Sequence, residues 1–229
     1  MNDVFLRACR GEAVPFTPIW LMRQAGRYQA SYRALRAKVD FLTLCRTPEL
    51  ATEVTVAAVD ELGVDAAIIF ADILLILEPL GVAFSFEKGE GPKIHVPLRT
   101  TAQVDALAEG IDVTASLGYV LEALGQTRQA LAGKVPLIGF AGAPFTLAAY
   151  AIEGGGAKHY TETKAFMYQD APRWHALMAK LTDATITYLQ AQVGAGAQAL
   201  QVFDSWVGCL GPDDYRERLE VAGGQGDAP

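Results

Sequence analysis

Short apolar runs alternate with helix-forming stretches along this chain, and that alternation is the strongest constraint on its fold. The runs cover residues 18–22, 66–70, 135–140 and 199–203. The run at residues 66–70 is continuous and apolar, which is typical of a strand that is covered on both faces of a parallel sheet. Repeated strand–helix units build such sheets with right-handed crossovers, so the sequence predicts an α/β fold with four strand–helix units.

The segments between the apolar runs carry helix signals. Thr47 is a predicted N-cap, Pro48 suits the first helical position, and Gly63 is expected to end that helix. We also predict a β-hairpin insertion over residues 82–97, around a glycine-rich turn, and a flexible loop that begins at the glycines of residues 154–156. Further helices are predicted over residues 31–40, 112–132, about 172–193 and 211–218.

Polar residues follow each predicted strand at its carboxyl end, which favours a (β/α)8 barrel with its site at that face. A doubly wound open sheet is the alternative architecture. A complete barrel needs roughly 250 residues, and four units already occupy this chain. We therefore expect a single, incomplete barrel domain over residues 1–229, truncated to about the first four units of a longer protein. Residues 219–229 lack periodicity and are expected to form a disordered tail.

The turn after the first apolar run, residues 23–28, is the leading candidate for a ligand site. Arg23 and Arg27 flank Gly26 there. A guanidinium group presents five donors in a planar fork that matches a carboxylate, and glycine permits a close backbone approach. The turn is predicted to bind an acidic small molecule, although each arginine alone could equally be an ordinary surface residue. Asp72 and Ser205 follow strands and could instead be helix caps.

Composition narrows the choice of partner and compartment. The formal net charge is −7, which disfavours nucleic acid and anionic membrane surfaces as partners. The most apolar region, residues 66–86, is interrupted by Asp72 and Glu78, so no membrane span is expected. Charged residues near the N-terminus argue against a secretion signal, and three widely separated cysteines suggest reduced thiols. We expect a cytoplasmic protein.

Motifs for metals and common cofactors are missing from the sequence. The three histidines are isolated from one another and from cysteine, so no metal site is predicted. There is no phosphate-binding loop and no nucleophile elbow. The glycines of residues 194–196 precede a strand instead of following one, which excludes a dinucleotide fingerprint.

Five motifs together resemble the uroporphyrinogen decarboxylase family. They are RQAGRY at 23–28, FADIL at 70–74, GFAGAPFTLAAY at 139–150, EGGG at 153–156 and FDSWVGCL at 203–210. The resemblance runs in order from about residue 3 to about residue 218. It implies a TIM-barrel carboxy-lyase that works as a homodimer and needs neither a metal nor an organic cofactor.

The resemblance also implies a substrate and a set of site residues. The family decarboxylates the four acetate side chains of uroporphyrinogen III to give coproporphyrinogen III. Arg23 and Asp72 are then the expected catalytic residues, with Asp72 facing the pyrrole N–H groups. A histidine that the family uses near its C-terminus has no counterpart here. The expected substrate-binding residues are Arg23, Gln24, Ala25, Gly26, Arg27, Phe70, Asp72, Tyr150, Phe203 and Ser205. Two alternatives stay open, an inactive half-barrel and a relative of the corrinoid-dependent methyltransferases.

Overall fold

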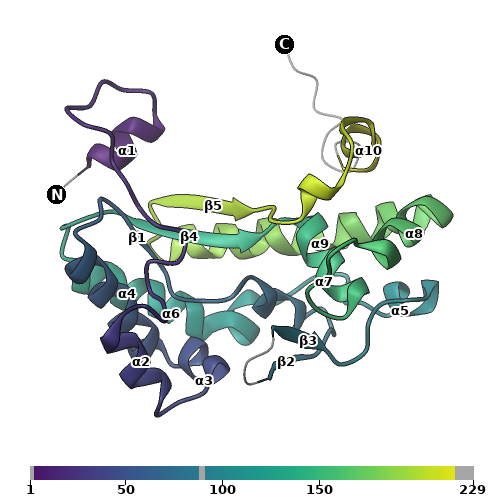
Figure 1. Ribbon diagram of the computed structural model, residues 1–229, viewed down its shortest axis with the longest axis horizontal. Helices are drawn as coiled ribbons and strands as arrows, with labels where there is room; N and C mark the ends of the chain where they lie inside the picture. The colour runs from purple at the N-terminus through teal and green to yellow at the C-terminus, as the bar shows by residue number, and fades with distance from the viewer. Residues whose placement is uncertain (1–2, 88–90, 220–229) are drawn as a thin grey trace. The chain divides into compact units, whose positions relative to one another are not determined.

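The computed structural model describes residues 3–87 and 91–219 (Figure 1). Three strands form a parallel sheet in the order β1-β4-β5, and β2 and β3 form a separate antiparallel pair. The predicted α/β class and the β-hairpin insertion are therefore confirmed. The elements before the hairpin are α1 (Val4–Cys9), α2 (Ala30–Arg36), α3 (Phe41–Arg46), α4 (Pro48–Leu62), β1 (Ala67–Ile68) and the 3-10 helix η1 (Ile73–Leu77).

The remaining elements complete the alternation. They are β2 (Phe84–Phe86), β3 (Pro92–Ile94), α5 (Thr101–Asp105), α6 (Val113–Leu131), β4 (Leu137–Gly142), α7 (Pro144–Glu153), α8 (Thr161–Gln169), α9 (Ala171–Gly194), β5 (Ala199–Phe203), the 3-10 helix η2 (Val207–Cys209) and α10 (Pro212–Arg218). The chain divides into two compact units. The first contains described residues 3–72, 113–140 and 189–201, and the second contains 73–87, 91–112, 141–188 and 202–219.

The first unit has its core around the packed helices α4 and α6, which lie side by side in Figure 1. Proline at its first position and Gly63 at φ 65° bound α4 as the sequence predicts. Thr47 does occupy the N-cap position, but its hydroxyl donates to the carbonyl of Thr43 at 2.7 Å instead of capping the helix. The side chain of Thr52 bridges to α6 by donating to the carbonyl of Ala123 at 3.3 Å.

A buried glutamine joins β4 to α9 within the first unit. The Phe140 N–H donates to Gln192 Oε1, and Gln192 Nε2 donates back to the Phe140 carbonyl, both at 2.8 Å. Gly139 makes this possible, because a Cβ there would lie 2.5 Å from Gln192 Oε1 and 3.0 Å from the Ala197 Cβ. The close approach of helix to strand therefore requires glycine at this position.

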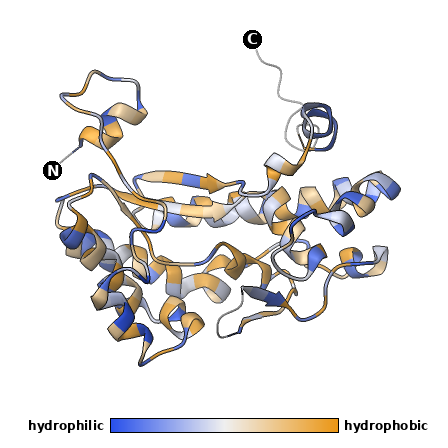
Figure 2. Ribbon diagram, viewed as in Figure 1, coloured by the Kyte–Doolittle hydropathy of each residue, from blue (hydrophilic) through white to orange (hydrophobic). Residues whose placement is uncertain are grey.

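The second unit is built around α7, in which seven of ten residues are buried. The Ile94 N–H donates to the Gly154 carbonyl at 2.8 Å, which ties the hairpin to the end of α7. Phe145 of α7 meets Trp174 of α9 with ring centroids 6.0 Å apart. Helix α10 has no buried residue and is hydrophilic along its whole length in Figure 2. The second unit therefore combines a hydrophobic interior with a polar helix, α10, that contributes no buried residue.

Two sequence predictions differ from the structure, the strand at residues 18–22 and the loop after residue 156. Residues 18–22 form no strand, since their backbone makes only one ladder-like bond, from the Asp65 N–H to the Ile19 carbonyl at 2.8 Å. Residues 3–87 and 91–219 therefore form three of the four expected parallel strands. The flexible loop expected after the glycines of residues 154–156 contains α8, which the glycine-based prediction overlooked. The expected tail lies outside the described residues from position 220 onward.

Candidate functional site

The arginine turn, residues 23–28, is held from inside by the side chain of Gln24. That side chain is 1% exposed. Its Oε1 accepts from the Leu21 N–H at 3.3 Å, and its Nε2 donates to the Ala66 carbonyl at 3.2 Å, next to β1. The Tyr28 hydroxyl donates to the Gln24 carbonyl and closes the turn. The turn is therefore fixed to the strand edge by a buried amide and not by its charged residues.

Gly26 is required by the tightness of the turn. A Cβ at this position would lie 3.0 Å from the Tyr28 ring and 3.1 Å from the Arg23 carbonyl. Gln29 supports the same peptide, because its Oε1 accepts from the Gly26 N–H at 3.0 Å. The sequence predicted a close approach at Gly26, and the structure assigns that approach to the turn itself.

Arg23 and Arg27 carry the two guanidinium groups of this turn. Both side chains are exposed, and among the described residues neither makes a hydrogen bond or an ion pair. Arg33, by contrast, uses its guanidinium to donate to the carbonyls of Arg27 and Tyr28 at 2.8 and 2.9 Å. The turn thus combines a rigid backbone with two positive charges that have no internal acidic partner, which suits an external anion.

An aromatic cluster in the same unit lies beside the segment that carries Asp72. The Phe70 ring is 5.7 Å from the Tyr32 ring and 5.8 Å from the Phe41 ring. The Phe70 N–H donates to the Thr55 hydroxyl at 3.0 Å, which fixes the backbone two residues before Asp72. Ala25 and Phe70 pack against the same buried cluster of Tyr32, Leu44 and Val54. The structure therefore brings the arginine turn and the β1 end together.

Asp72 is half-buried and immediately precedes η1. Burial raises the pKa of the Cys45 thiol well above its usual range, and the negative charge of Asp72 adds to that shift. Burial also raises the pKa of Tyr32, while the positive charges of Arg36 and Arg27 oppose the rise. The charge of Asp72 thus raises the pKa of Cys45, and the charge of Arg27 opposes the rise in the pKa of Tyr32.

The second unit holds the other predicted substrate-binding residues, Tyr150, Phe203 and Ser205. Tyr150 and Phe203 are half-buried, and Ser205 is exposed. The Trp206 ring contacts two tyrosine rings. Its centroid is 5.7 Å from that of Tyr150 and 5.6 Å from that of Tyr160. Burial raises the pKa of Tyr160 to about 12, so its hydroxyl stays protonated at neutral pH.

The end of β5 is tied to the start of α7 by four hydrogen bonds. The Ala143 N–H donates to the Phe203 carbonyl at 2.9 Å. The Thr146 hydroxyl donates to Asp204 Oδ1 at 2.8 Å and accepts from the Trp206 N–H at 3.2 Å, and the Thr146 N–H also bonds the Asp204 carboxylate. Helix α7 receives no cap from the side chain of Ala143, so Asp204 supplies it. Sequence reasoning missed Thr146 and Trp206, although both lie inside the resembling motifs.

Burial raises the pKa of Asp204 above the ordinary carboxyl value, although the two bonds from Thr146 oppose that rise. Asp204 also lines a cleft of about 330 Å³ in the second unit, with walls from α7, α9, β5 and α10. That volume is at the lower end of the range for small-molecule sites.

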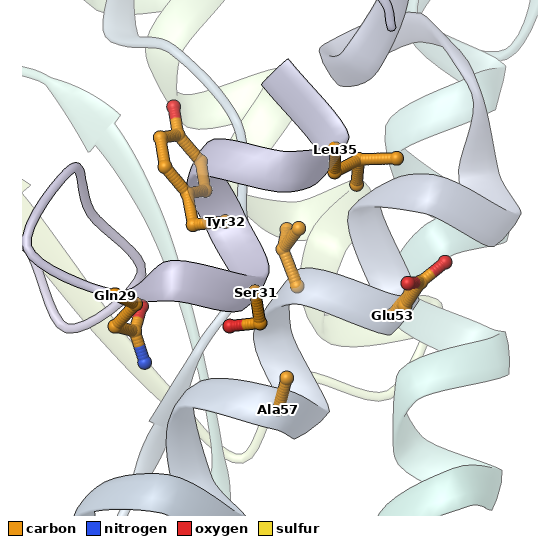
Figure 3. A pocket seen from close by; sticks show the side chains of 7 residues that line it. Gln29, Ser31, Tyr32, Leu35, Glu53 and Ala57 are labelled. Atoms are coloured by element: carbon orange, nitrogen blue, oxygen red, sulfur yellow. The ribbon is translucent and has the colours of Figure 1, made fainter. Parts of the chain in front are cut away.

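A cavity of about 20 Å³ lies between α2 and α4 in the first unit (Figure 3). Its lining includes Gln29, Tyr32 and Glu53. The space accommodates about one water molecule, so it is too small for an organic ligand. Across the described residues, no group of three potential metal ligands is found, and no helix has the length and hydropathy needed to cross a bilayer.

The family is shown by sequence comparison. The family model named uroporphyrinogen decarboxylase (URO-D) matches residues 1–220, so the chain belongs to the uroporphyrinogen decarboxylase family. The relative named uroporphyrinogen decarboxylase in Carboxydothermus hydrogenoformans is 57% identical over 217 residues, which are 95% of this chain and 62% of the relative. The protein of the same name in Sorangium cellulosum is 56% identical over 220 residues, 96% of this chain and 62% of the relative. The chain thus spans 62% of the length of these two curated relatives.

A solved structure shares the fold. A methyltransferase from Methanosarcina mazei superposes with a TM-score of 0.77, covering 96% of this chain and 64% of that chain. The sequences are 20% identical, so the likeness concerns the fold alone. The resemblance that the five motifs indicated is confirmed by the family match, and the arrangement of parallel strands and helices agrees with the shared fold.

Proposed function

We propose that this chain serves the decarboxylation of the four acetate side chains of uroporphyrinogen III to coproporphyrinogen III. The observation that carries the proposal is the family match over residues 1–220. The two curated relatives quoted above carry the decarboxylase name at 56% identity or more. This favours the decarboxylase over a methyltransferase, whose likeness is limited to the fold.

In this proposal the first unit binds carboxylates and stabilises developing charge. The substrate is a polycarboxylate, and the chain carries a formal net charge of −7, so attraction has to come from local positive groups. Arg23 and Arg27 supply them on a turn that is already rigid, with Gln24, Ala25 and Gly26 forming its backbone. Paired guanidinium donors hold the macrocycle in register. Arg23 orients the reacting acetate, because arginine is too weak an acid to donate the proton itself.

Asp72 has the electrostatic role. Protonation of a pyrrole ring carbon makes the ring cationic, and the ring then accepts the electron pair that departing CO₂ leaves behind. A carboxylate that accepts hydrogen bonds from the pyrrole N–H groups stabilises that positive charge as it develops. One such preorganised group typically contributes about 3 kcal/mol to the transition state. The substrate thus acts as its own electron sink, and no organic cofactor or metal is required.

The other predicted residues bound the substrate with apolar and hydroxyl groups. Phe70 in the first unit presents a ring held by Tyr32 and Phe41. Tyr150, Phe203 and Ser205 in the second unit contact the substrate by resemblance to the family motifs. A cytoplasmic homodimer is the expected assembly on the same grounds.

The proposed architecture is the (β/α)8 barrel of the family, of which this chain supplies about four units in one domain. Residues 18–22 take the place of the first barrel strand, supported by the Asp65–Ile19 backbone bond beside β1. A second candidate function is tetrapyrrole binding without turnover. The exposure of Ile19 at 57%, Leu200 at 43% and Val202 at 45% favours loss of turnover through an incomplete barrel, because apolar side chains on strand-like segments are normally covered in a complete sheet.

Incubation of the purified chain with uroporphyrinogen III, followed by chromatography of the porphyrins, separates the two functions. Formation of coproporphyrinogen supports the decarboxylase, and substrate binding without product supports the second candidate. Absence of both would contradict the proposal.

The Arg23→Lys variant tests the orienting role. Lysine keeps the charge and loses the planar fork, so turnover should fall about tenfold or more, as expected for a lost bidentate contact of about 1.4 kcal/mol. Arg216→Lys is the matched control, because the Arg216 side chain is 66% exposed on α10 and forms an ion pair with Asp213 three residues earlier on the same helix. Near-normal turnover of Arg23→Lys would exclude the orienting role.

A further inference from the structure

We infer that Thr146 is a positioning residue, whose hydroxyl sets the Ser205 backbone and the Trp206–Tyr150 ring pair for the substrate. The inference rests on the proposed function, because that function assigns Ser205 and Tyr150 to substrate contact. No motif role had been assigned to Thr146. Its side chain is 0% exposed, so it acts only through the groups that it bonds.

The hydrogen-bond pattern carries the inference. The Thr146 hydroxyl donates to Asp204 Oδ1 at 2.8 Å and accepts from the Trp206 N–H at 3.2 Å. These partners are the residues directly before and after Ser205. One hydroxyl therefore fixes the backbone on both sides of an exposed serine, in a segment that belongs to neither β5 nor η2.

The same hydroxyl connects Ser205 to Tyr150. Thr146 and Tyr150 lie four residues apart on α7, so their side chains share one face of that helix. Trp206, whose N–H bonds Thr146, meets the Tyr150 ring at 5.7 Å and the Tyr160 ring at 5.6 Å. Loss of the hydroxyl would remove the hydrogen bond that holds the Trp206 backbone. The Trp206 ring would then no longer be held in one position against the Tyr150 ring.

Asp204 determines which way the Thr146 hydroxyl donates its proton. A hydroxyl has one proton to donate, and the Asp204 carboxylate accepts it. The oxygen lone pairs of Thr146 then remain for the Trp206 N–H. Valine, which has the same shape, fills the buried space without either bond, while serine keeps both.

The test compares Thr146→Val with Thr146→Ser in the full chain, using uroporphyrinogen III turnover and tryptophan quenching by acrylamide. Thr146→Val should raise KM about tenfold and leave kcat within about twofold, because the contact groups lose the positioning that comes from the bond to the Asp204 carboxylate and the bond from the Trp206 N–H. Simple destabilisation would instead lower the active fraction, and thus kcat, at unchanged KM. Thr146→Ser should restore the wild-type KM.

Acrylamide quenching reads the positioning without any turnover. Thr146→Val should make Trp206 more accessible, and the same change in a Trp206→Phe background should leave the quenching of the other tryptophans unaltered. Thr101→Val is the matched control, since Thr101 also donates its hydroxyl to an aspartate, Asp170 at 3.2 Å, in the same unit. It should alter neither KM nor quenching.

The outcomes separate the inference from the proposed function. Unchanged quenching in Thr146→Val, or failure of Thr146→Ser to restore the wild-type behaviour, would overturn the positioning role. An unchanged KM in an active Thr146→Val enzyme would overturn it as well. Absence of turnover in the wild-type chain would refute the proposed function, and the role of Thr146 in fixing Trp206 would then be decided by quenching alone.

Discussion

The two units hold their candidate residues with different chemistry. The first uses buried glutamine amides: Gln24 fixes the arginine turn, Gln29 supports Gly26, and Gln192 joins α9 to β4. The second uses threonine hydroxyls bonded to carboxylates, Thr146 with Asp204 and Thr163 with Glu153. Within the described residues, every buried glutamine belongs to the first unit. An amide does not titrate and a carboxylate does, so the two frameworks should respond differently to pH.

The largest loss of stability is expected at Gly139, where the Gln192 amide leaves no space for a side chain. Gly139→Ala would place a Cβ 2.5 Å from Gln192 Oε1. The glutamine can move only by giving up two buried hydrogen bonds to Phe140, so stability should fall by about 3 kcal/mol. Urea unfolding at neutral pH measures this loss.

Gly125→Ala is the control for that change. Gly125 lies inside α6, where a Cβ would lie 3.9 Å from the Ala195 carbonyl oxygen, an ordinary van der Waals distance. Alanine there should stabilise the chain by about 0.5–1 kcal/mol because it favours helix. Equal changes in unfolding free energy at Gly139 and Gly125 would show that the Gln192–Phe140 bridge does not contribute to stability.

A smaller effect is expected at the arginine turn. Gln24→Met keeps the side-chain length and removes both amide bonds, which should cost about 2 kcal/mol, since the Ala66 carbonyl loses a buried partner while the Leu21 N–H can meet water. The loss should be the same from pH 5 to pH 8, measured by urea unfolding. Gln169→Met, at an exposed position of α8, should change stability by less than about 0.5 kcal/mol. A pH-dependent loss at Gln24 would break the contrast between the units.

The most subtle effect concerns Asp204 and the pH dependence of stability. Because burial raises its pKa in the folded state, Asp204 favours folding most at pH values below the ordinary carboxyl pKa, and that contribution is lost as pH rises through the raised value. Asp204→Asn keeps an acceptor oxygen for Thr146 and removes the titration. The unfolding free energy of the variant relative to the wild type should therefore increase from pH 4 to pH 7. A flat or falling difference would contradict the raised pKa.

The α/β fold class was predicted correctly from the sequence, because it depends mainly on the pattern of hydrophobic residues. The β5 run was predicted with its observed bounds, because a strand between polar residues on both sides leaves little choice. The prediction of a strand at residues 18–22 was wrong, since the backbone there bonds to Asp65 and to Gln24 and pairs with no neighbouring strand among the described residues. Helix α8 was missed because its start, Tyr160 at φ 53°, follows glycines that usually signal a loop.

The candidate site was predictable in its motif residues and not in their supports. The exposed guanidinium groups of Arg23 and Arg27 could be expected from residue chemistry. The roles of Gln24 inside the turn and of Thr146 between Asp204 and Trp206 depend on partners 42 to 60 positions apart in sequence. No local pattern encodes such pairings, so they emerge only with tertiary structure.

The three thiols differ in solvent exposure, so their rates of chemical labelling can report how often the native state opens locally. Cys9 is exposed, Cys209 is half-buried, and Cys45 is buried with its thiolate disfavoured by burial and by the charge of Asp72. An alkylating reagent should modify Cys9 at once and reach Cys45 only when the α3 region transiently opens. The labelling rate of a single sulfur would then report how often the surroundings of the proposed catalytic carboxylate unfold.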